Sequence, residues 1–135
     1  MMMEEEAPED CSEKYTISKK IGTGSFATVW LGVDRKTSRK VALKAISKDR
    51  LTEKLLENVK SEMSTLREFR HPQLVELVEI FKTSSNLLIV LEYVQGGDLQ
   101  KFIRLRGRLP CDTTARRFMI DFASGLAFLW SKHLI

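Results

Sequence analysis

The pattern of hydrophobic and polar positions over residues 15–46 predicts three β-strands joined by polar turns. A first run with apolar positions leads to Gly22, and a run rich in β-branched and bulky residues returns over residues 28–33. A polar turn at residues 34–38 precedes a third run, residues 39–46. The short turns between the runs indicate neighbouring antiparallel strands.

The third strand carries one charge among apolar residues. Side chains alternate across a strand, so Lys44 shares one face with apolar neighbours while the opposite face is also apolar. The strand is therefore expected to be covered on both faces, and a buried lysine needs a partner. The alternative is a lysine on an edge strand that reaches solvent.

Residues 51–69 form the first predicted helix, because their apolar residues recur at helical spacing. The recurring positions are Leu51, Leu55, Leu56, Val59, Met63, Leu66 and Phe69. Glu62 falls on the same stripe, and an acid that faces a core is unfavourable unless it is paired. We therefore predict an ion pair between Glu62 and Lys44. The alternative is a peripheral glutamate at the edge of the stripe.

The rest of the chain predicts two more strands and two more helices. Strands are expected over residues 74–82 and 87–93, joined by the turn Thr83–Asn86. Helices are expected over residues 99–105 and 112–132, and Asp112 or Thr113 can cap the longer one. Pro72 ends the helix predicted over residues 51–69, and His71 is expected to be a structural turn residue. The fold class is therefore α+β, with a five-stranded antiparallel sheet.

Two glycines, Gly22 and Gly24, lie between the first two strands. Glycine adopts backbone angles that other residues avoid and lets N–H groups approach a ligand closely, which suits a phosphate. A dinucleotide-binding loop would be followed by a helix, whereas here a strand follows. The sequence also lacks the Gly-Lys-Ser/Thr ending of a Walker loop. A flap between two antiparallel strands is the favoured interpretation.

These features resemble the N-terminal lobe of a protein kinase. Residues 22–29 are similar to the kinase glycine-rich loop, residues 41–44 to its Val-Ala-Ile-Lys strand, and Glu62 to the helix-C glutamate that pairs with the strand lysine. Ala27 stands where the third glycine usually lies. Because alanine is small, we expect a mild effect on loop mobility and no loss of nucleotide binding.

Residues 91–99 resemble the kinase hinge. The resemblance implies that Leu91 is the gatekeeper, that backbone groups of Glu92 and Val94 meet the adenine edge, and that Asp98 reaches ribose hydroxyls. The alternative for Asp98 is a helix N-cap, and the two roles can coexist. The implied ATP-binding residues are Ile21, Gly22, Gly24, Ser25, Phe26, Val29, Ala42, Lys44, Glu62, Leu91, Glu92, Val94 and Asp98.

The resemblance also sets the expected domain organisation and activity. Residues 14–91 correspond to the N-lobe, 92–98 to the hinge and 99–135 to the start of an incomplete C-lobe. The implied function is the ATP-binding portion of a serine/threonine protein kinase. The catalytic loop and the metal-binding Asp-Phe-Gly motif are missing, so no catalytic residue or metal ligand is assigned, and Mg²⁺ is expected only with those residues.

A second function stays open. The chain can be a short regulatory form that binds nucleotide or a hydrophobic partner without catalysis, with the apolar face of residues 112–132 as its docking surface. Among kinases, the similarity is greatest to the autophagy-initiating, unc-51-like group, on residues 49–51, 60–62 and 91–99 and on Phe118-Met119. Kinases of the calcium/calmodulin-dependent type share much of this pattern.

The amino-acid composition limits which other functions are expected. The chain has 135 residues and is 43% hydrophobic, with no apolar run long enough to span a membrane and no signal-peptide pattern, so a cytoplasmic protein is expected. Cys11 and Cys111 are too few for a disulfide framework or a zinc site. Residues 1–13 hold six acidic side chains and no basic one, which predicts a disordered tail. The basic remainder is interspersed with acids, which disfavours a nucleic-acid partner.

Overall fold

The computed structural model of the chain describes residue 8, residues 13–109 and residues 113–135. The chain falls into two compact units. Unit 1 comprises the residues up to Glu68 together with Glu76–Tyr93, and unit 2 comprises Phe69–Val75 and Val94–Ile135. The predicted acidic tail lies almost wholly outside the described residues, as do Cys11, Cys111 and the candidate cap Asp112.

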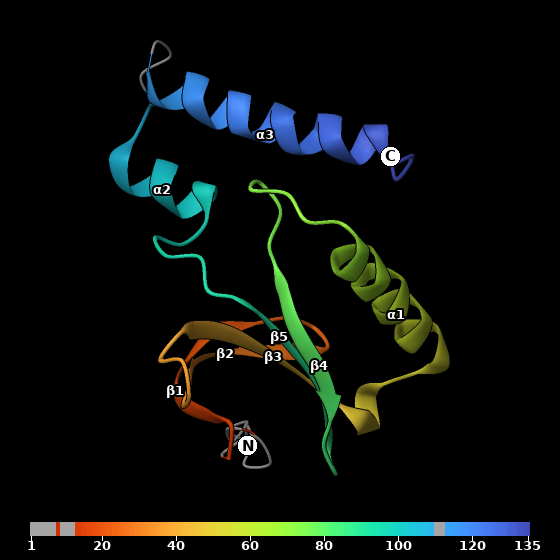
Figure 1. The fold of residues 1–135 in the computed structure, drawn as a ribbon. Helices are drawn as coiled ribbons and strands as arrows, with labels where there is room; N and C mark the ends of the chain where they lie inside the picture. The colour runs from red at the N-terminus through yellow and green to blue at the C-terminus, as the bar shows by residue number, and fades with distance from the viewer. Residues whose placement is uncertain (1–7, 9–12, 110–112) are drawn as a thin grey trace. The chain divides into compact units, whose positions relative to one another are not determined.

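Unit 1 is built on a five-stranded antiparallel sheet, which confirms the predicted fold (Figure 1). The strand order is β1-β2-β3-β5-β4, so β5 inserts between β3 and β4. The strands are β1 (Tyr15–Thr23), β2 (Ala27–Asp34), β3 (Lys40–Ser47), β4 (Leu77–Lys82) and β5 (Asn86–Glu92). The predicted hairpin turn between β4 and β5 is present, with the Thr83 amide donating to the Asn86 carbonyl at 2.8 Å.

β4 begins three residues later than the sequence pattern predicts. The Leu74 amide donates to the His71 carbonyl at 3.0 Å, which closes a turn where a strand beginning at Leu74 was expected. Residues 69–75 belong to unit 2, so this stretch does not pair with the sheet. The apolar run that continues into β4 hides the break, because periodicity alone does not separate a packed turn from a strand.

One face of the sheet closes on itself, and we call it the closed face. Its fully or nearly buried residues form one cluster, with Ile17, Trp30 and Phe81 packed against it. The buried members are Tyr15, Val41, Leu43, Ala45, Leu88 and Val90. Tyr15 of β1 stacks on Phe81 of β4, with ring centroids 6.4 Å apart. Side chains from the first and last strands of the sheet therefore meet over this face.

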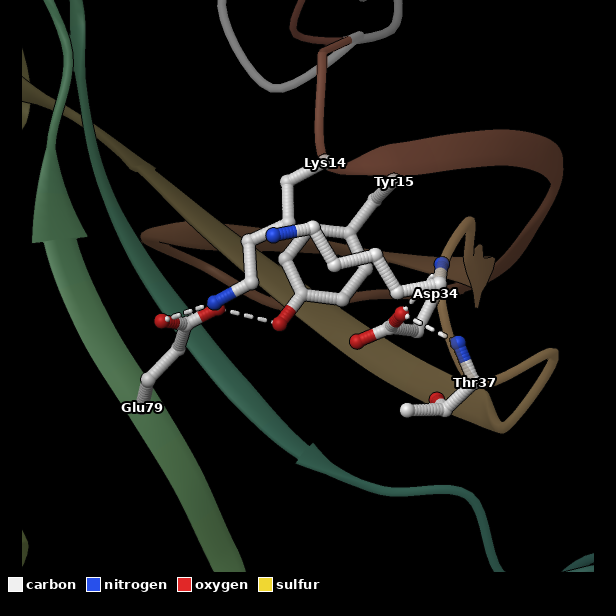
Figure 2. A network of polar contacts seen from close by, with 6 residues as sticks. Lys14, Tyr15, Asp34, Thr37 and Glu79 are labelled. Carbon is white, nitrogen blue, oxygen red and sulfur yellow. Dashed lines mark hydrogen bonds and ion pairs between the residues drawn. The ribbon is translucent and has the colours of Figure 1, made fainter.

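Polar contacts join the same two strands, and we call them the edge clasp (Figure 2). The Lys14 ammonium lies 2.6 Å from the Glu79 carboxylate, and the Tyr15 hydroxyl donates to the same carboxylate. Burial raises the pKa of Glu79, but the hydrogen bonds from Lys14 and Tyr15 and the charge of Lys14 outweigh it, so this pKa lies below its usual range. Glu79 is thus ionised and tied to both residues near neutral pH.

The opposite face of the sheet is partly covered by α1 (Glu53–Glu68), and we call it the helix face (Figure 1). A short 3₁₀ turn, η2 (Lys48–Arg50), leads into this helix. The Leu55 amide donates to the Thr52 hydroxyl at 3.2 Å, as an N-cap does. Val59 and Met63 are the buried residues of α1, and they pack in a cluster with Ile46, Leu77, Leu87 and Ile89. Residues 51–69 are therefore helical nearly as predicted.

Unit 2 consists of the turn at residues 69–75, α2 (Leu99–Arg106) and α3 (Thr114–Ser131). The His71 ring stacks on Phe128 of α3 at 4.8 Å between centroids, so His71 has the structural role predicted for it. Gly125 of α3 is buried against Gln73, whose Cβ would lie 3.4 Å from an added methyl group. The absence of a side chain at Gly125 therefore lets the turn approach the helix closely.

The two helices of unit 2 begin differently. Asp98 caps α2, because its carboxylate accepts a hydrogen bond from the Lys101 amide at 2.6 Å. Thr113 occupies the N-cap position of α3, but its side chain makes no capping hydrogen bond. The prediction that the Thr113 side chain can cap α3 is therefore wrong. The backbone of Thr113 has φ −124° and ψ −75°, whereas an N-cap residue usually has an extended backbone.

Candidate functional site

The register of the sheet brings several predicted site residues onto one face. Gly22 is opposite Val29, Val29 is opposite Lys44, and Lys44 is opposite Ile89. Residues directly opposite each other in an antiparallel pair project to the same face. These residues therefore form a row across β1, β2, β3 and β5 on the helix face.

A second row lies beside the first on the same face. Leu31 is opposite Ala42, and Ala42 is opposite Leu91. Ala42 and Lys44 are two residues apart on β3, so the two rows share a face. Leu91 packs against the buried cluster that contains Ile89 and Met63, which holds it in place. An apolar surface therefore lies next to a single lysine, as predicted from the alternation in β3.

The glycine-rich turn between β1 and β2 is tight. Gly24, Ser25 and Phe26 connect the strands, and the Gly24 amide donates to the Ala27 carbonyl at 2.8 Å. Neither Gly22 nor Gly24 has a positive φ; in the described part of the chain the glycines that do are Gly96, Gly97 and Gly107. The unusual backbone angles expected here are therefore absent.

What the glycines of this turn provide is space. A Cβ added to Gly22 would lie 3.7 Å from Val29, and one added to Gly24 would lie 3.5 Å from the Ala27 carbonyl, both ordinary contacts. The backbone is thus bare on this part of the turn without being strained. Phe26 at the tip is half exposed, and Ile21 also reaches solvent.

The predicted ion pair between Lys44 and Glu62 is not made. Glu62 is exposed and Lys44 is only partly buried. The ion pairs among the described residues join Lys14 with Glu79 and Arg39 with Glu76. The expectation rested on burial of both charges, and neither is desolvated enough here to require a partner. The buried stripe of α1 runs through Val59 and Met63, so Glu62 lies at its edge.

The end of β5 is held by contacts with residue 76. The Glu92 amide donates to the Glu76 carbonyl, and the Glu92 carboxylate accepts from the Glu76 amide, both at 2.9 Å. The Arg39 guanidinium donates to the Glu76 carboxylate at 2.7 Å. This hydrogen bond and the charge of Glu76 raise the pKa of Arg39. The position of Glu92, where the hinge was predicted to start, is therefore fixed within unit 1.

Two predicted site residues lie in unit 2. Val94 is exposed, and Asp98 is the N-cap of α2. Gly96 and Gly97 have φ values of 95° and 80°, a conformation that glycine adopts readily and other residues rarely. The double glycine thus makes the turn that leads from Val94 to α2.

A hollow of about 460 Å³ lies elsewhere on unit 1, between α1 and the β4–β5 hairpin. Its lining includes Leu56, Val59, Met63, Ile80 and Leu87. Neither Lys44 nor the glycine-rich turn lines it. It is therefore distinct from the two rows of predicted site residues.

Sequence reasoning missed the edge clasp and one close approach of strands. A Cβ on Gly32 would lie 2.5 Å from the Leu43 side chain, so only glycine fits there without displacement. An isolated glycine within a strand is a known signal of such an approach. For the clasp no comparable signal existed, because Tyr15 and Glu79 are 64 residues apart.

The fold, the strand lysine and the glycine-rich turn agree with a match to the protein kinase domain family over residues 15–135. The chain belongs to this family. Serine/threonine-protein kinase ATG1c of Arabidopsis thaliana is 38% identical over 121 residues, covering 90% of this chain and 16% of the relative. Serine/threonine-protein kinase atg1 of Schizosaccharomyces pombe is 38% identical over 141 residues, with 90% and 17% covered. The similarity to the unc-51-like kinases is thereby confirmed.

Another serine/threonine kinase and a solved structure also match this chain. CBL-interacting serine/threonine-protein kinase 13 of Arabidopsis thaliana is 40% identical over 121 residues, covering 89% of this chain and 24% of the relative. The crystal structure of Rad53 residues 1–466 in complex with AMP-PNP superposes with a TM-score of 0.76 and 27% identity, covering 90% of this chain and 32% of that one. The chain spans less than a third of the length of each of these relatives.

In the part that the structure describes, no helix is both long and apolar enough to cross a membrane. Among those residues there is also no cluster of three or more His, Cys, Asp or Glu side chains that could hold a metal ion.

Proposed function

We propose that this chain binds ATP and is the nucleotide-binding part of a serine/threonine protein kinase. The observation that carries the proposal is the register of the sheet, which aligns Gly22, Val29 and Lys44 in one row beside Ala42 and Leu91. A cation, a bare backbone turn and an apolar surface are the three features that a nucleotide triphosphate requires. The Rad53 structure, which holds AMP-PNP, has the same fold.

Each feature has a separate task in the proposed binding. The ammonium of Lys44 neutralises phosphate charge, and the backbone around Gly22, Gly24, Ser25 and Phe26 lies over the phosphates. The apolar side chains contact the purine ring, and they are Ile21, Val29, Ala42 and Leu91. Binding therefore combines charge neutralisation at one end of the ligand with burial of apolar surface at the other.

The remaining assignments rest on the resemblance to kinases. Backbone groups of Glu92 and Val94 are proposed to meet the adenine edge, and Asp98 the ribose. One Asp98 oxygen already accepts from the Lys101 amide, but an ionised carboxylate has about four acceptor sites, so capping leaves room for a ribose hydroxyl. Glu62 is proposed to pair with Lys44 once phosphate is bound, which requires a rearrangement of their side chains or of α1.

Phosphoryl transfer to a protein serine or threonine is proposed for the longer protein, as is a cytoplasmic role related to autophagy. The support is the similarity to the ATG1 kinases. In kinases, metal ions bridge the phosphates and a catalytic aspartate orients the hydroxyl. We assign neither to the described residues, so the proposal for this chain itself is limited to binding.

The proposal is tested by titrating the chain with a fluorescent ATP analogue, N-methylanthraniloyl-ATP. Lys44→Ala should weaken binding at least about tenfold, because a charged contact with phosphate contributes roughly 1.5–3 kcal/mol. Lys40→Ala, which removes an exposed lysine from the same strand, is the matched control and should leave the affinity unchanged. Equal affinity of Lys44→Ala and the wild type would contradict the proposed site.

The role of Asp98 is tested by comparing ATP with 2′,3′-dideoxy-ATP. If Asp98 also contacts the ribose, Asp98→Ala should weaken binding of ATP more than binding of the dideoxy analogue. Loss of the helix cap alone should affect both ligands alike, since the cap stabilises α2 whichever nucleotide is present. An equal effect on both nucleotides would therefore reduce Asp98 to its structural role.

A second candidate function is that of a binding module without catalysis. The observation that favours it is the apolar surface of α3, on which Met119, Phe122 and Trp130 are 63%, 61% and 71% exposed. Exposed apolar surface of this kind marks an interaction site or an aggregation risk. Light scattering distinguishes the two: a monodisperse monomer that binds ATP saturably supports the module, and aggregation of the pure chain opposes it.

A further inference from the structure

One side of α2 presents an exposed leucine beside several cations. Lys101, Arg104 and Leu105 lie three and four residues apart, so they project from one side of the helix. Arg108 follows directly after Gly107, which ends the helix. We call these four residues the cationic stripe. Leu105 is 77% exposed, so this stripe presents an apolar side chain surrounded by positive charge.

The other side of α2 is already used inside unit 2. Phe102 packs edge-to-face on Phe118 of α3, with ring centroids 5.7 Å apart. The guanidinium of Arg106 lies over the Phe102 ring at 4.9 Å from its centroid. These contacts anchor α2 on α3 through Phe102, while Leu99 and Ile103 of the same helix remain 49% and 41% exposed. The exposure of Leu105 is therefore not explained by packing of the helix on its neighbour.

The charges of the stripe are not balanced locally. Residues 94–135 contain seven lysines and arginines and three acidic residues. Asp98, at the start of α2, is engaged as the cap. Among the residues that the structure describes, no acidic side chain is within ion-pair distance of Lys101, Arg104 or Arg108.

We propose that the cationic stripe binds an acidic protein segment that inserts an apolar side chain against Leu105. Charge complementarity selects a partner rich in aspartate or glutamate and raises its association rate. The exposed leucine gives the complex an apolar contact, and apolar contacts enclosed by polar groups are typical of interfaces. This inference is independent of ATP binding, because none of the four residues of the cationic stripe is a proposed nucleotide-binding residue.

A protein segment fits the stripe better than a lipid surface does. A helix that lies in a membrane interface buries a broad apolar face. Phe102, among the apolar positions of α2, is instead packed on α3, and Leu105 is the most exposed apolar residue of the helix, with cations close by in sequence. One side chain surrounded by charges matches a residue on an acidic peptide, with carboxylates on either side.

The test uses fluorescence anisotropy of the 135-residue chain with a labelled probe. The probe is a short fluorescein-labelled peptide of alternating glutamate and alanine with one central phenylalanine, at physiological salt. Leu105→Ala should weaken binding about tenfold, the factor that corresponds to a loss of about 1.4 kcal/mol. The double variant K101E/R104E should abolish saturable binding.

Two matched controls separate a site from general charge attraction. K36E/K40E makes the same charge change at exposed positions of unit 1 and should bind the peptide as the wild type does. A peptide with alanine in place of phenylalanine should bind the wild type about as weakly as the original peptide binds Leu105→Ala. Circular dichroism confirms that each variant is folded.

Four results would overturn the inference. The wild type could show no saturable binding, or the two double variants could lose binding equally. The third is that anionic phosphatidylserine vesicles bind through the same residues while the peptide does not, which would identify a lipid surface. If Leu105→Ala still binds the peptide as the wild type does, Leu105 makes no apolar contact with it and only general charge attraction is left. That result also contradicts the proposed site.

Discussion

The two faces of the sheet in unit 1 are covered in different ways. The closed face is covered by side chains of the sheet itself, and Leu43, Leu88 and Val90 on it are fully buried. The helix face is covered only in part, with Lys44 partly buried and a hollow of about 460 Å³ beside α1. One sheet thus has a face whose core residues are largely buried and a face that is covered only in part.

This difference assigns stability and binding to opposite faces. Burial of apolar surface is the dominant favourable contribution to folding, and on the closed face it is extensive without any ligand. A binding surface must stay open and therefore contributes less. Substitutions on the closed face should lower the free energy of unfolding strongly, whereas those at exposed positions of the helix face should affect it little.

Leu43→Ala should have the largest effect on stability. Leu43 is fully buried, and truncation of such a leucine lowers the free energy of unfolding by about 3 kcal/mol through lost burial and the cavity that remains. Urea denaturation followed by circular dichroism measures it. Leu91→Ala on the helix face is the comparison and should have a smaller effect, since Leu91 is only partly buried. Equal losses of stability in the two variants would contradict the different contributions of the two faces.

Gly32→Ala should follow, with a loss of about 2 kcal/mol from overpacking. The added Cβ would lie 2.5 Å from Leu43 Cδ1, and Leu43 is too closely packed to move freely. Gly22→Ala, whose Cβ would meet Val29 at 3.7 Å, is the matched control with a smaller effect.

Replacing Leu43 by valine removes the clashing atom, so the loss caused by Gly32→Ala should shrink in a Leu43→Val background. Such non-additivity is expected of residues in contact. If the two losses simply add, the approach of Gly32 to Leu43 does not limit this position.

The edge clasp should make stability depend on pH in the acid range. The folded pKa of Glu79 is below its ordinary value, so the clasp stabilises fully above the unfolded pKa, near 4.5, and is lost as the pH falls through the folded pKa. Tyr15→Phe should lower the free energy of unfolding by roughly 1.5 kcal/mol at neutral pH. Urea midpoints measured from pH 7 down to about pH 3 check both expectations.

Glu79→Gln is the variant that isolates this titration. It should flatten the acid dependence, although Asp34 should preserve part of it, because hydrogen bonds from the Thr37 and Lys36 amides hold the pKa of Asp34 below its usual value. If the stability of Glu79→Gln fell with pH as steeply as that of the wild type, the edge clasp would contribute nothing to the acid dependence.

Glu62→Ala should have the smallest effect, below about 0.5 kcal/mol, as is usual for exposed residues without a partner. Removing one member of a buried ion pair would instead lower stability by about 3–5 kcal/mol. The same urea experiment on Glu62→Ala, with Lys44→Ala beside it, decides whether the two charges are paired in solution. A loss of several kcal/mol in both variants would contradict the open arrangement described above.

The sequence predicted most of the fold because its signals are local. The alternation in β3 correctly placed Val41, Leu43 and Ala45 on one face of the sheet and Ile46 on the other. Helical spacing located α1 to within two residues at either end. What it could not give was the start of β4, because an apolar turn that packs on α3 through His71 resembles a strand in composition.

For the candidate site, the residues were found more readily than their contacts. Lys44 and Glu62 were recognised as unusual charges, but whether they meet depends on where α1 lies on the sheet, and no local pattern fixes that. The edge clasp depends on curvature of the whole sheet, which brings Lys14 and Tyr15 to Glu79. Contacts of this range follow from the assembled sheet and not from any short stretch of sequence.

The position of β5 between β3 and β4 has a consequence for the order in which the chain is made. During synthesis β4 emerges before β5, yet its neighbour in the sheet is β5, so β4 has no strand to pair with until about residue 92 is available. The pairing of β3 with β5 spans α1 and β4 in sequence, and pairing at such a separation is slow and leaves the edge of β3 exposed meanwhile. We therefore expect that a nascent chain ending within the β4–β5 turn cannot close the sheet, and that the last strand of the unit completes its fold.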